Sequence, residues 1–293
     1  MARITAPIRR ELPDIQWLER MYNNRMRVPD HGDYFARWAA QSAMVRRSLP
    51  CQLDVPYCDG PRQRLDAFAA RQAGAPLVVF VHGGYWKALD KSFHSFVAGE
   101  LHDAGAAVVV PNYALAPQAS VPQSTMDVAQ AVAWAWRHAR ALKADRRRLV
   151  VVGHSAGGTM AAMMMACAWP LVQAGMPSGA VRRGIGLSGL YDLEPLMRTP
   201  SLQEALRLSP AQVQQASPAR VPYSGNGRFV AMVGADESGE YLRQNRLIQQ
   251  AWGRDRVPQA QALPGLNHFS ILDALATRGH RLNTLARQLL RTA

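Results

Sequence analysis

The chain has 293 residues, of which 48% are hydrophobic, and this favours one α/β domain with a large core. No apolar run is long enough to cross a membrane and no signal peptide is evident, so we expect a soluble, cytoplasmic protein. The net charge of +13 comes almost entirely from arginines scattered along the chain, which favours neither a nucleic-acid nor a membrane partner.

Cysteine and histidine spacing argues against a metal centre. The three cysteines, Cys51, Cys58 and Cys167, are odd in number and share no metal-ligand spacing. None of the eight histidines belongs to an H-E-x-x-H pair or a similar one. We therefore expect reduced cysteines, no metal and no cofactor.

The first 50 residues are predicted to form a helical segment. Apolar side chains recur at helical spacing between residues 11 and 49, with a break at residues 29–32. We interpret residues 1–50 as a helical segment that packs across the site as part of a lid, and residues 51–293 as the main domain.

The rest of the chain alternates strands and helices. Residues 53–57 and 64–68 are predicted as two short edge strands around a turn. Buried strands follow at residues 77–81, 106–110, 148–152, 184–187, 228–233 and 259–263, with helices between them that include residues 93–102 and 125–141. This order predicts a mostly parallel central sheet with helices on both faces and ligands at the carboxyl edge of its strands.

A glycine-flanked serine ends the strand at residues 148–152. The segment Gly153-His154-Ser155-Ala156-Gly157 has the Gly-x-Ser-x-Gly pattern of a nucleophile elbow, and the small, apolar residues 161–166 predict the helix that must follow. Glycines leave room for the sharp corner, and a helix N-terminus favours negative charge beside it. We therefore predict that Ser155 is a nucleophile.

A glycine pair follows the strand at residues 77–81, in the segment His82-Gly83-Gly84-Tyr85-Trp86. Acyl transfer builds negative charge on a carbonyl oxygen, which needs fixed donors nearby. We expect the backbone N–H groups of Gly83, Gly84 and Ala156 to form this oxyanion hole. The alternative is an ordinary turn after a strand.

The remaining catalytic groups are expected after the last two strands. His268 is the predicted general base, because it lies in a turn between the last strand and the C-terminal helix and completes the chain order serine, acid, histidine. Asp236 and Glu237 are both candidates for the acid that orients it, and their positions in the sequence do not decide between them.

Several segments resemble the kynurenine formamidase (arylformamidase) branch of the α/β-hydrolases, close to the hormone-sensitive-lipase-like esterases. The resemblance covers residues 50 to 293 and extends weakly into residues 22–30. Its most specific part is the Tyr-Trp pair at residues 85–86, and residues 153–158, 188–196, 217–218 and 265–269 also carry it.

This resemblance implies an α/β-hydrolase fold and a role for each site residue. Ser155 corresponds to the nucleophile, His268 to the base, and Gly83, Gly84 and Ala156 to the oxyanion donors. Glu237 corresponds to the triad acid, with Asp236 as the second choice, and it is a glutamate where many relatives have aspartate. The side chains expected to line a substrate pocket are His82, Tyr85, Trp86, Tyr113 and Phe269.

The implied reaction is hydrolysis of N-formyl-L-kynurenine to formate and kynurenine through a formyl-enzyme, a step of tryptophan catabolism. One alternative is a broad carboxylesterase or amidase that acts on small acyl or aryl esters with the same residues. Another is a catalytically silent fold that binds ligands. We expect a small-molecule substrate as the partner. The sequence does not determine the oligomeric state, and a homodimer is one option.

Overall fold

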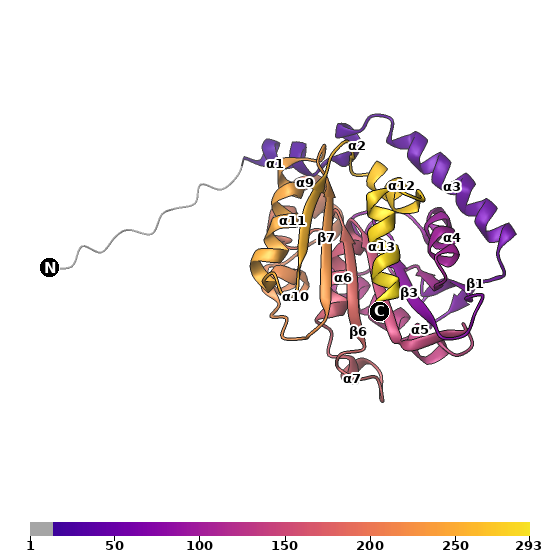
Figure 1. Ribbon diagram of the computed structural model, residues 1–293. Coiled ribbons are helices and arrows are strands. Elements are labelled where there is room, and N and C mark those ends of the chain that lie inside the picture. The colour runs from indigo at the N-terminus through magenta and orange to yellow at the C-terminus, as the bar shows by residue number, and fades with distance from the viewer. Residues whose placement is uncertain (1–13) are drawn as a thin grey trace.

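Eight strands form one twisted sheet in a computed structural model, which describes residues 14–293 (Figure 1). Their order is β1-β2-β4-β3-β5-β6-β7-β8, in which β3 to β8 run parallel and β1 and β2 form an antiparallel edge. The strands are β1 Cys51–Pro56, β2 Arg64–Phe68, β3 Ala75–Val81, β4 Ala107–Pro111, β5 Ala144–His154, β6 Val181–Leu187, β7 Arg228–Gly234 and β8 Gln259–Leu263. The predicted mostly parallel sheet is confirmed.

The central strands are apolar on both sides because both faces of the sheet are covered. Successive side chains of a strand point to opposite faces, so Leu77 and Val79 of β3 join one hydrophobic cluster while Val78 and Phe80 join the other. The same alternation in β5 explains why these strands have continuous apolar runs in the sequence.

Helices cover the two faces in separate groups (Figure 1). Helices α5, α6 and α11 pack on one face, and α3, α4, α12 and α13 pack on the other. The helices are α1 Ile15–Tyr22, α2 Asn24–Arg27, α3 His31–Ser48, η1 Lys91–Phe93, α4 Ser95–Asp103, α5 Val121–His138, α6 Ala156–Met165, α7 Trp169–Val172, α8 Glu194–Met197, α9 Pro200–Leu206, α10 Pro210–Ala216, η2 Pro218–Arg220, α11 Gly239–Trp252, α12 Ser270–Ala276 and α13 Arg281–Arg291.

The predicted boundaries of α5 and the predicted start of β5 were wrong. Helix α5 begins at Val121, four residues before the expected start, because Ser120 and Gln123 form a capping box. The proline in the first turn is tolerated, since the N–H that it lacks would have no partner within the helix. It ends at His138, and β5 already starts at Ala144. The arginines at residues 146–148 therefore lie in β5, which starts four residues before the strand predicted at 148–152.

The N-terminal helices cross the carboxyl edge of the sheet. Helix α1 packs against α9 and α11, and α3 packs against α4 and η1 on the opposite face (Figure 1). Trp38 anchors α3, since its buried indole donates a hydrogen bond of 2.5 Å to Asp273 Oδ1 of α12. None of the helices within residues 14–293 is long and apolar enough to span a bilayer.

Candidate active site

Ser155 sits in a strained corner between β5 and α6. Its backbone has φ 55° and ψ −122°, a region that a residue with a Cβ rarely adopts. The serine N–H donates to Leu187 O of β6 at 2.7 Å, which ties the corner to the neighbouring strand. The side chain is thereby held at the N-terminus of α6, where N–H groups without helical partners favour negative charge.

The glycines of the elbow are required by close backbone contacts. A Cβ on Gly153 would lie 2.0 Å from Gly157 O, and a Cβ on Gly157 would lie 2.0 Å from Val81 O of β3. Both distances are far below van der Waals contact. The Gly-x-Ser-x-Gly pattern is therefore a packing requirement of the corner that presents Ser155.

The second glycine pair lies against the same corner. A Cβ on Gly83 would be 2.9 Å from Ser155 Cβ and 2.9 Å from His154 O. Gly84 has φ +105°, and Tyr85 and Trp86 continue with positive φ, so the loop turns sharply beside Ser155. The structure thus brings the three predicted oxyanion residues, Gly83, Gly84 and Ala156, around one serine.

His268 and Glu237 form a buried pair. Glu237 Oε2 lies 2.7 Å from His268 Nδ1, so the predicted base and one of the two predicted acids are in contact. Asp236, the second choice, is exposed, and its backbone N–H donates to Leu266 O in the loop that carries the histidine. The geometry distinguishes two acids that the sequence did not, because adjacent side chains leave the loop in different directions.

Glu237 is held by two further donors. Its Oε1 accepts hydrogen bonds from the Ser188 hydroxyl at 2.5 Å and from the Gly234 N–H at 2.8 Å. Ser188 lies at the end of β6 with φ 53°, so it has a positive φ like the elbow serine. Sequence reasoning did not assign it a role, although it lies in the 188–196 segment that carried part of the resemblance.

His154 connects the elbow to the base. Its Nε2 lies 2.7 Å from His268 O, and the two rings are 4.9 Å apart. Burial holds the pKa of His154 well below its usual range, so the ring is neutral and Nε2 donates to the carbonyl. This contact ties the backbone of His268, the predicted base, to the elbow.

A cavity of about 340 Å³ opens over Ser155 and His268. It is lined by residues of the N-terminal helices, of the glycine loop, of α9 and of the base loop: Tyr22, Asn23, Asn24, Arg25, Phe35, Trp38, Gly84, Tyr85, Lys87, Ala88, Leu89, His154, Ser155, Ser201, Leu202, His268 and Phe269. The N-terminal helices therefore form one wall of the cavity. Motion of this wall as a lid stays a prediction.

Two of the five predicted pocket side chains line this cavity, namely Tyr85 and Phe269. His82, Trp86 and Tyr113 lie outside its lining and are almost fully buried. The His82 ring stacks on the Tyr113 ring at 4.5 Å, and the Tyr113 hydroxyl donates to His82 O at 2.9 Å. These side chains support the glycine loop from behind because their rings point into the core.

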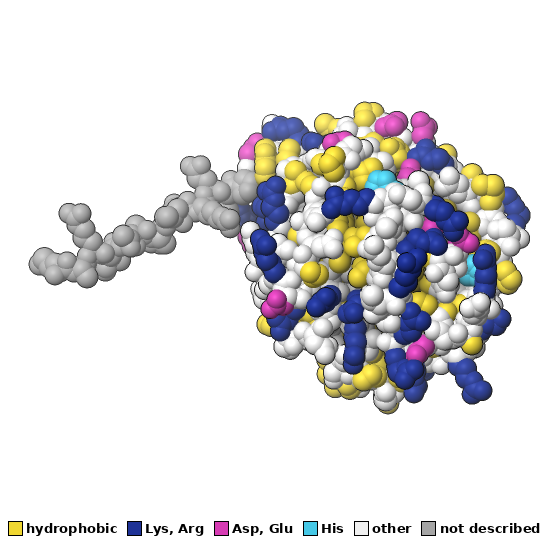
Figure 2. All heavy atoms as spheres, in the orientation of Figure 1, with side chains coloured by type: hydrophobic (Ala, Val, Ile, Leu, Met, Phe, Trp, Pro, Cys, Tyr) yellow, Lys and Arg dark blue, Asp and Glu magenta, His cyan; other side chains and the backbone are white. Residues whose placement is uncertain are grey.

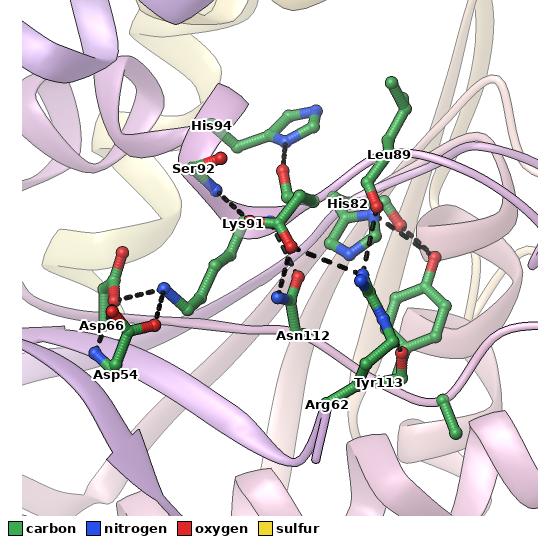
Figure 3. A network of polar contacts seen from close by, with 12 residues as sticks. Asp54, Arg62, Asp66, His82, Leu89, Lys91, Ser92, His94, Asn112 and Tyr113 are labelled. Atoms are coloured by element: carbon green, nitrogen blue, oxygen red, sulfur yellow. Dashed lines mark hydrogen bonds and ion pairs between the residues drawn. The ribbon is translucent and has the colours of Figure 1, made fainter.

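A polar network holds the far end of the glycine loop (Figure 3). Arg62 donates to Leu89 O at 3.0 Å and to Tyr113 O at 3.1 Å. Asn112 accepts from the Lys91 N–H at 2.7 Å. The Lys91 ammonium is buried between the carboxylates of Asp66 at 2.6 Å and Asp54 at 2.7 Å (Figure 3).

His82 and His94 lie behind the loop as neutral rings. The two rings stack 5.4 Å apart, and burial lowers the pKa of His82 to about 4 and that of His94 to about 3. A charge on either ring would be desolvated, so both remain uncharged near neutral pH. They pack the loop and are not candidates for the general base.

A chain of hydroxyls links the N-terminal wall to the nucleophile. Asn24 Nδ2 donates to the Tyr241 hydroxyl at 2.8 Å, which is 2.6 Å from the Tyr85 hydroxyl. Tyr85 in turn donates to Tyr22 O at 2.6 Å. Burial raises the pKa of Tyr241, and this effect outweighs the hydrogen bonds, including one to Ser155, that lower the pKa. The Tyr241 hydroxyl therefore stays protonated next to Ser155.

The positive charge does not gather at one place on the face of the molecule that is in view (Figure 2). Lys and Arg side chains are spread over the face in view, with few acidic ones among them (Figure 2).

Three free cysteines, Cys51, Cys58 and Cys167, are partly buried and form no disulfide within residues 14–293.

Comparisons with known proteins agree with this geometry. A family model described as the α/β-hydrolase fold matches residues 78–216. The solved structure of a candidate thioesterase from Silicibacter sp. TM1040 is 31% identical to this chain, covers 94% of it and 99% of its own length, and superposes with a TM-score of 0.81. The chain belongs to the α/β-hydrolase family.

Other relatives of this hydrolase are named kynurenine formamidase. The protein of Salmo salar is 26% identical over 95% of this chain and 94% of its own length. That of Drosophila melanogaster is 29% identical over 75% of each chain. The predicted α/β-hydrolase fold and the resemblance to this branch are therefore confirmed, and the hydrolase is an enzyme of the serine hydrolase type.

Proposed function

We propose that this hydrolase cleaves arylformamides, with N-formyl-L-kynurenine as the substrate, through a formyl-enzyme on Ser155. The observation that supports it most is the convergence of Ser155, His268 and Glu237 under a cavity lined by aromatic rings. Relatives named kynurenine formamidase, matched over most of the chain, support the choice of substrate.

In the first half of the proposed reaction the formyl carbon is attacked by Ser155 Oγ while His268 takes the hydroxyl proton. The negative charge that develops on the formyl oxygen is stabilised by the N–H groups of Gly83, Gly84 and Ala156. His268 then gives its proton to the nitrogen of the arylamine, and the C–N bond breaks. Glu237 stabilises the imidazolium that forms in between.

In the second half water replaces the arylamine. His268 removes a proton from water as the oxygen attacks the formyl ester, and it returns this proton to Ser155 Oγ as the C–O bond breaks. Formic acid leaves, it loses its remaining proton to solvent to give formate, and the resting enzyme is restored. No redox step is involved, so the reaction needs no cofactor.

The experiment is a comparison of kcat/KM for N-formyl-L-kynurenine and phenyl acetate. We expect a clear preference for the formamide, together with loss of both activities in Ser155→Ala by a factor of about 10⁴ or more with an unchanged melting temperature. Full activity in the variant would refute the nucleophile.

A preference for the acetate would instead favour a broad esterase. The likeness to a candidate thioesterase at 31% identity makes this the second candidate function. The same serine, histidine and acid serve both reactions, so substrate comparison and not the triad decides between them.

A further inference from the structure

The cavity above Ser155 has two chemically different parts. Its inner wall is aromatic, with Phe35, Trp38 and Phe269 in mutual ring contact at 5.5 to 6.2 Å. Its mouth carries two exposed cations, Arg25 of α2 and Lys87 of the glycine loop. The described residues that line the cavity include no carboxylate.

Arg25 is connected to the catalytic base through aromatic rings. Its guanidinium carbon lies 5.7 Å from the centroid of the Phe35 ring. The Phe35 ring meets the Phe269 ring edge-on at 5.5 Å, and the Phe269 ring is 5.5 Å from the imidazole of His268. The cation and the base thus lie at two ends of one aromatic wall.

The two cations differ in their availability. The Lys87 ammonium donates to Ser201 O at 2.9 Å, so it links the glycine loop to α9. Arg25 makes no ion pair with a carboxylate in the part of the chain that the structure describes, and only its cation–π contact with Phe35 positions it. A planar guanidinium held beside an aromatic wall is suited to bidentate binding of a carboxylate.

We propose that Arg25 is a specificity residue that binds a carboxylate on the leaving group of the substrate, with Lys87 adding to the attractive field. The formyl group would lie at Ser155, the aryl ring against Phe35 and Phe269, and the carboxylate at the mouth. The site therefore selects aryl substrates that carry a carboxylate over substrates of the same shape that lack this charge. This inference rests on the proposed function, because it concerns the leaving-group half of the same site.

The test compares two substrates that differ only in charge, N-formyl-L-kynurenine and its primary carboxamide. Arg25→Gln is expected to lower kcat/KM for the carboxylate substrate by roughly 10–100-fold, mainly through KM, because a hydrogen-bonded charge pair is lost from both the ground state and the transition state. Turnover of the carboxamide is expected to change less than about twofold.

Arg27 provides the matched control, since it lies on the same helix, is exposed and does not line the cavity. Arg27→Gln should leave both substrates unaffected. Arg25→Lys, which keeps the charge and loses the planar fork, should fall between wild type and Arg25→Gln. Raising the ionic strength should reduce the discrimination in wild type and not in Arg25→Gln.

Equal losses on both substrates in Arg25→Gln, or an equal effect of Arg27→Gln, would overturn the proposal. If wild type hydrolyses neither formamide, the proposed function fails by itself. The same variants are then compared on the acetate esters of 3-(4-hydroxyphenyl)propanoate and of its carboxamide. A loss confined to the carboxylate ester would uphold the role of Arg25, and its absence would refute it.

Discussion

The carboxyl edge of the sheet and the N-terminal helices build the same cavity in different ways. At the sheet edge, Ser155, Glu237 and His268 each follow a strand and are fixed by backbone contacts and buried hydrogen bonds. The N-terminal wall mixes buried side chains such as Trp38 with less buried ones, of which Phe35 on α3 is half-buried and Arg25 on the short helix α2 is exposed. The difference agrees with our proposals that the edge supplies the chemistry and that the N-terminal helices select the substrate.

The largest effect that would sharpen this comparison is expected at the acid. Glu237→Gln should lower kcat by on the order of 10³–10⁴-fold, because the amide neither stabilises the imidazolium nor fixes the correct tautomer of His268. Asp236→Asn, one residue away on an exposed side chain, should cost less than about twofold. Steady-state kinetics of both variants measure this, and the reverse order would reassign the acid.

A smaller loss is expected from crowding the oxyanion loop. The methyl group of Gly83→Ala would lie 2.9 Å from Ser155 Cβ and from His154 O, so the loop must shift away from the nucleophile. We expect kcat to fall by about 10²–10³-fold, as on the loss of one oxyanion donor.

The control for Gly83→Ala is Gly239→Ala at the start of α11. A methyl group there meets nothing within 4 Å, and the backbone has no positive φ. It should retain wild-type kcat. Comparable losses in the two variants would show that the effect is general destabilisation and not displacement of an oxyanion donor.

The strands and the chemical motifs were predictable because their causes are local. Alternation of apolar residues reflects burial on both faces of β3 and β5, and the glycines beside Ser155 are required by contacts within a few residues of the corner or with the adjacent strand. The start of α5 was missed although Ser120 and Gln123 form a capping box, because the proline between them is more typical of a loop than of a helix interior.

Tyr85, Phe269 and the helical segment across the site were predicted, but the rest of the cavity wall was not, because it depends on contacts between distant segments. Trp86 and Tyr113 were expected in the pocket on account of their residue type and position, and the fold buries both in the core. Ser188 reaches Glu237 across 49 positions of the chain, and Asn24 reaches Tyr241 across 217. No periodicity or spacing encodes such pairs.

Acidification should lower the stability of the folded protein through the buried histidines behind the glycine loop. His94 is uncharged in the folded state, with its pKa lowered to about 3 by burial, whereas an unfolded histidine has a pKa of about 6.5. Between these two pKa values the unfolded chain binds more protons than the folded one. The free energy of unfolding is therefore highest above a pH of about 6.5 and decreases as the pH falls. At pH 5 each such histidine costs about 2 kcal/mol.

His94→Phe tests this sign. Urea unfolding at several pH values should show that the loss of stability from pH 7.5 to pH 5 is smaller in the variant by about 2 kcal/mol. Between pH 7.5 and 9 the two stability curves should run parallel. Parallel curves over the whole range would mean that the pKa of His94 is the same in the folded and the unfolded protein.

The smallest effect is expected where the two regions meet. Asn24→Ala removes the hydrogen bond of 2.8 Å to the Tyr241 hydroxyl and should lower the free energy of unfolding by about 1–1.5 kcal/mol. The control is Met26→Ala, which changes a side chain that is 66% exposed and should leave the free energy of unfolding unchanged. KM should rise a few-fold in Asn24→Ala, because the wall is less fixed, while kcat stays near wild type. If kcat fell as far as in Gly83→Ala, Asn24 would be needed to hold Tyr241, and through it Ser155, in place. The N-terminal helices would then contribute to turnover and not only to substrate binding.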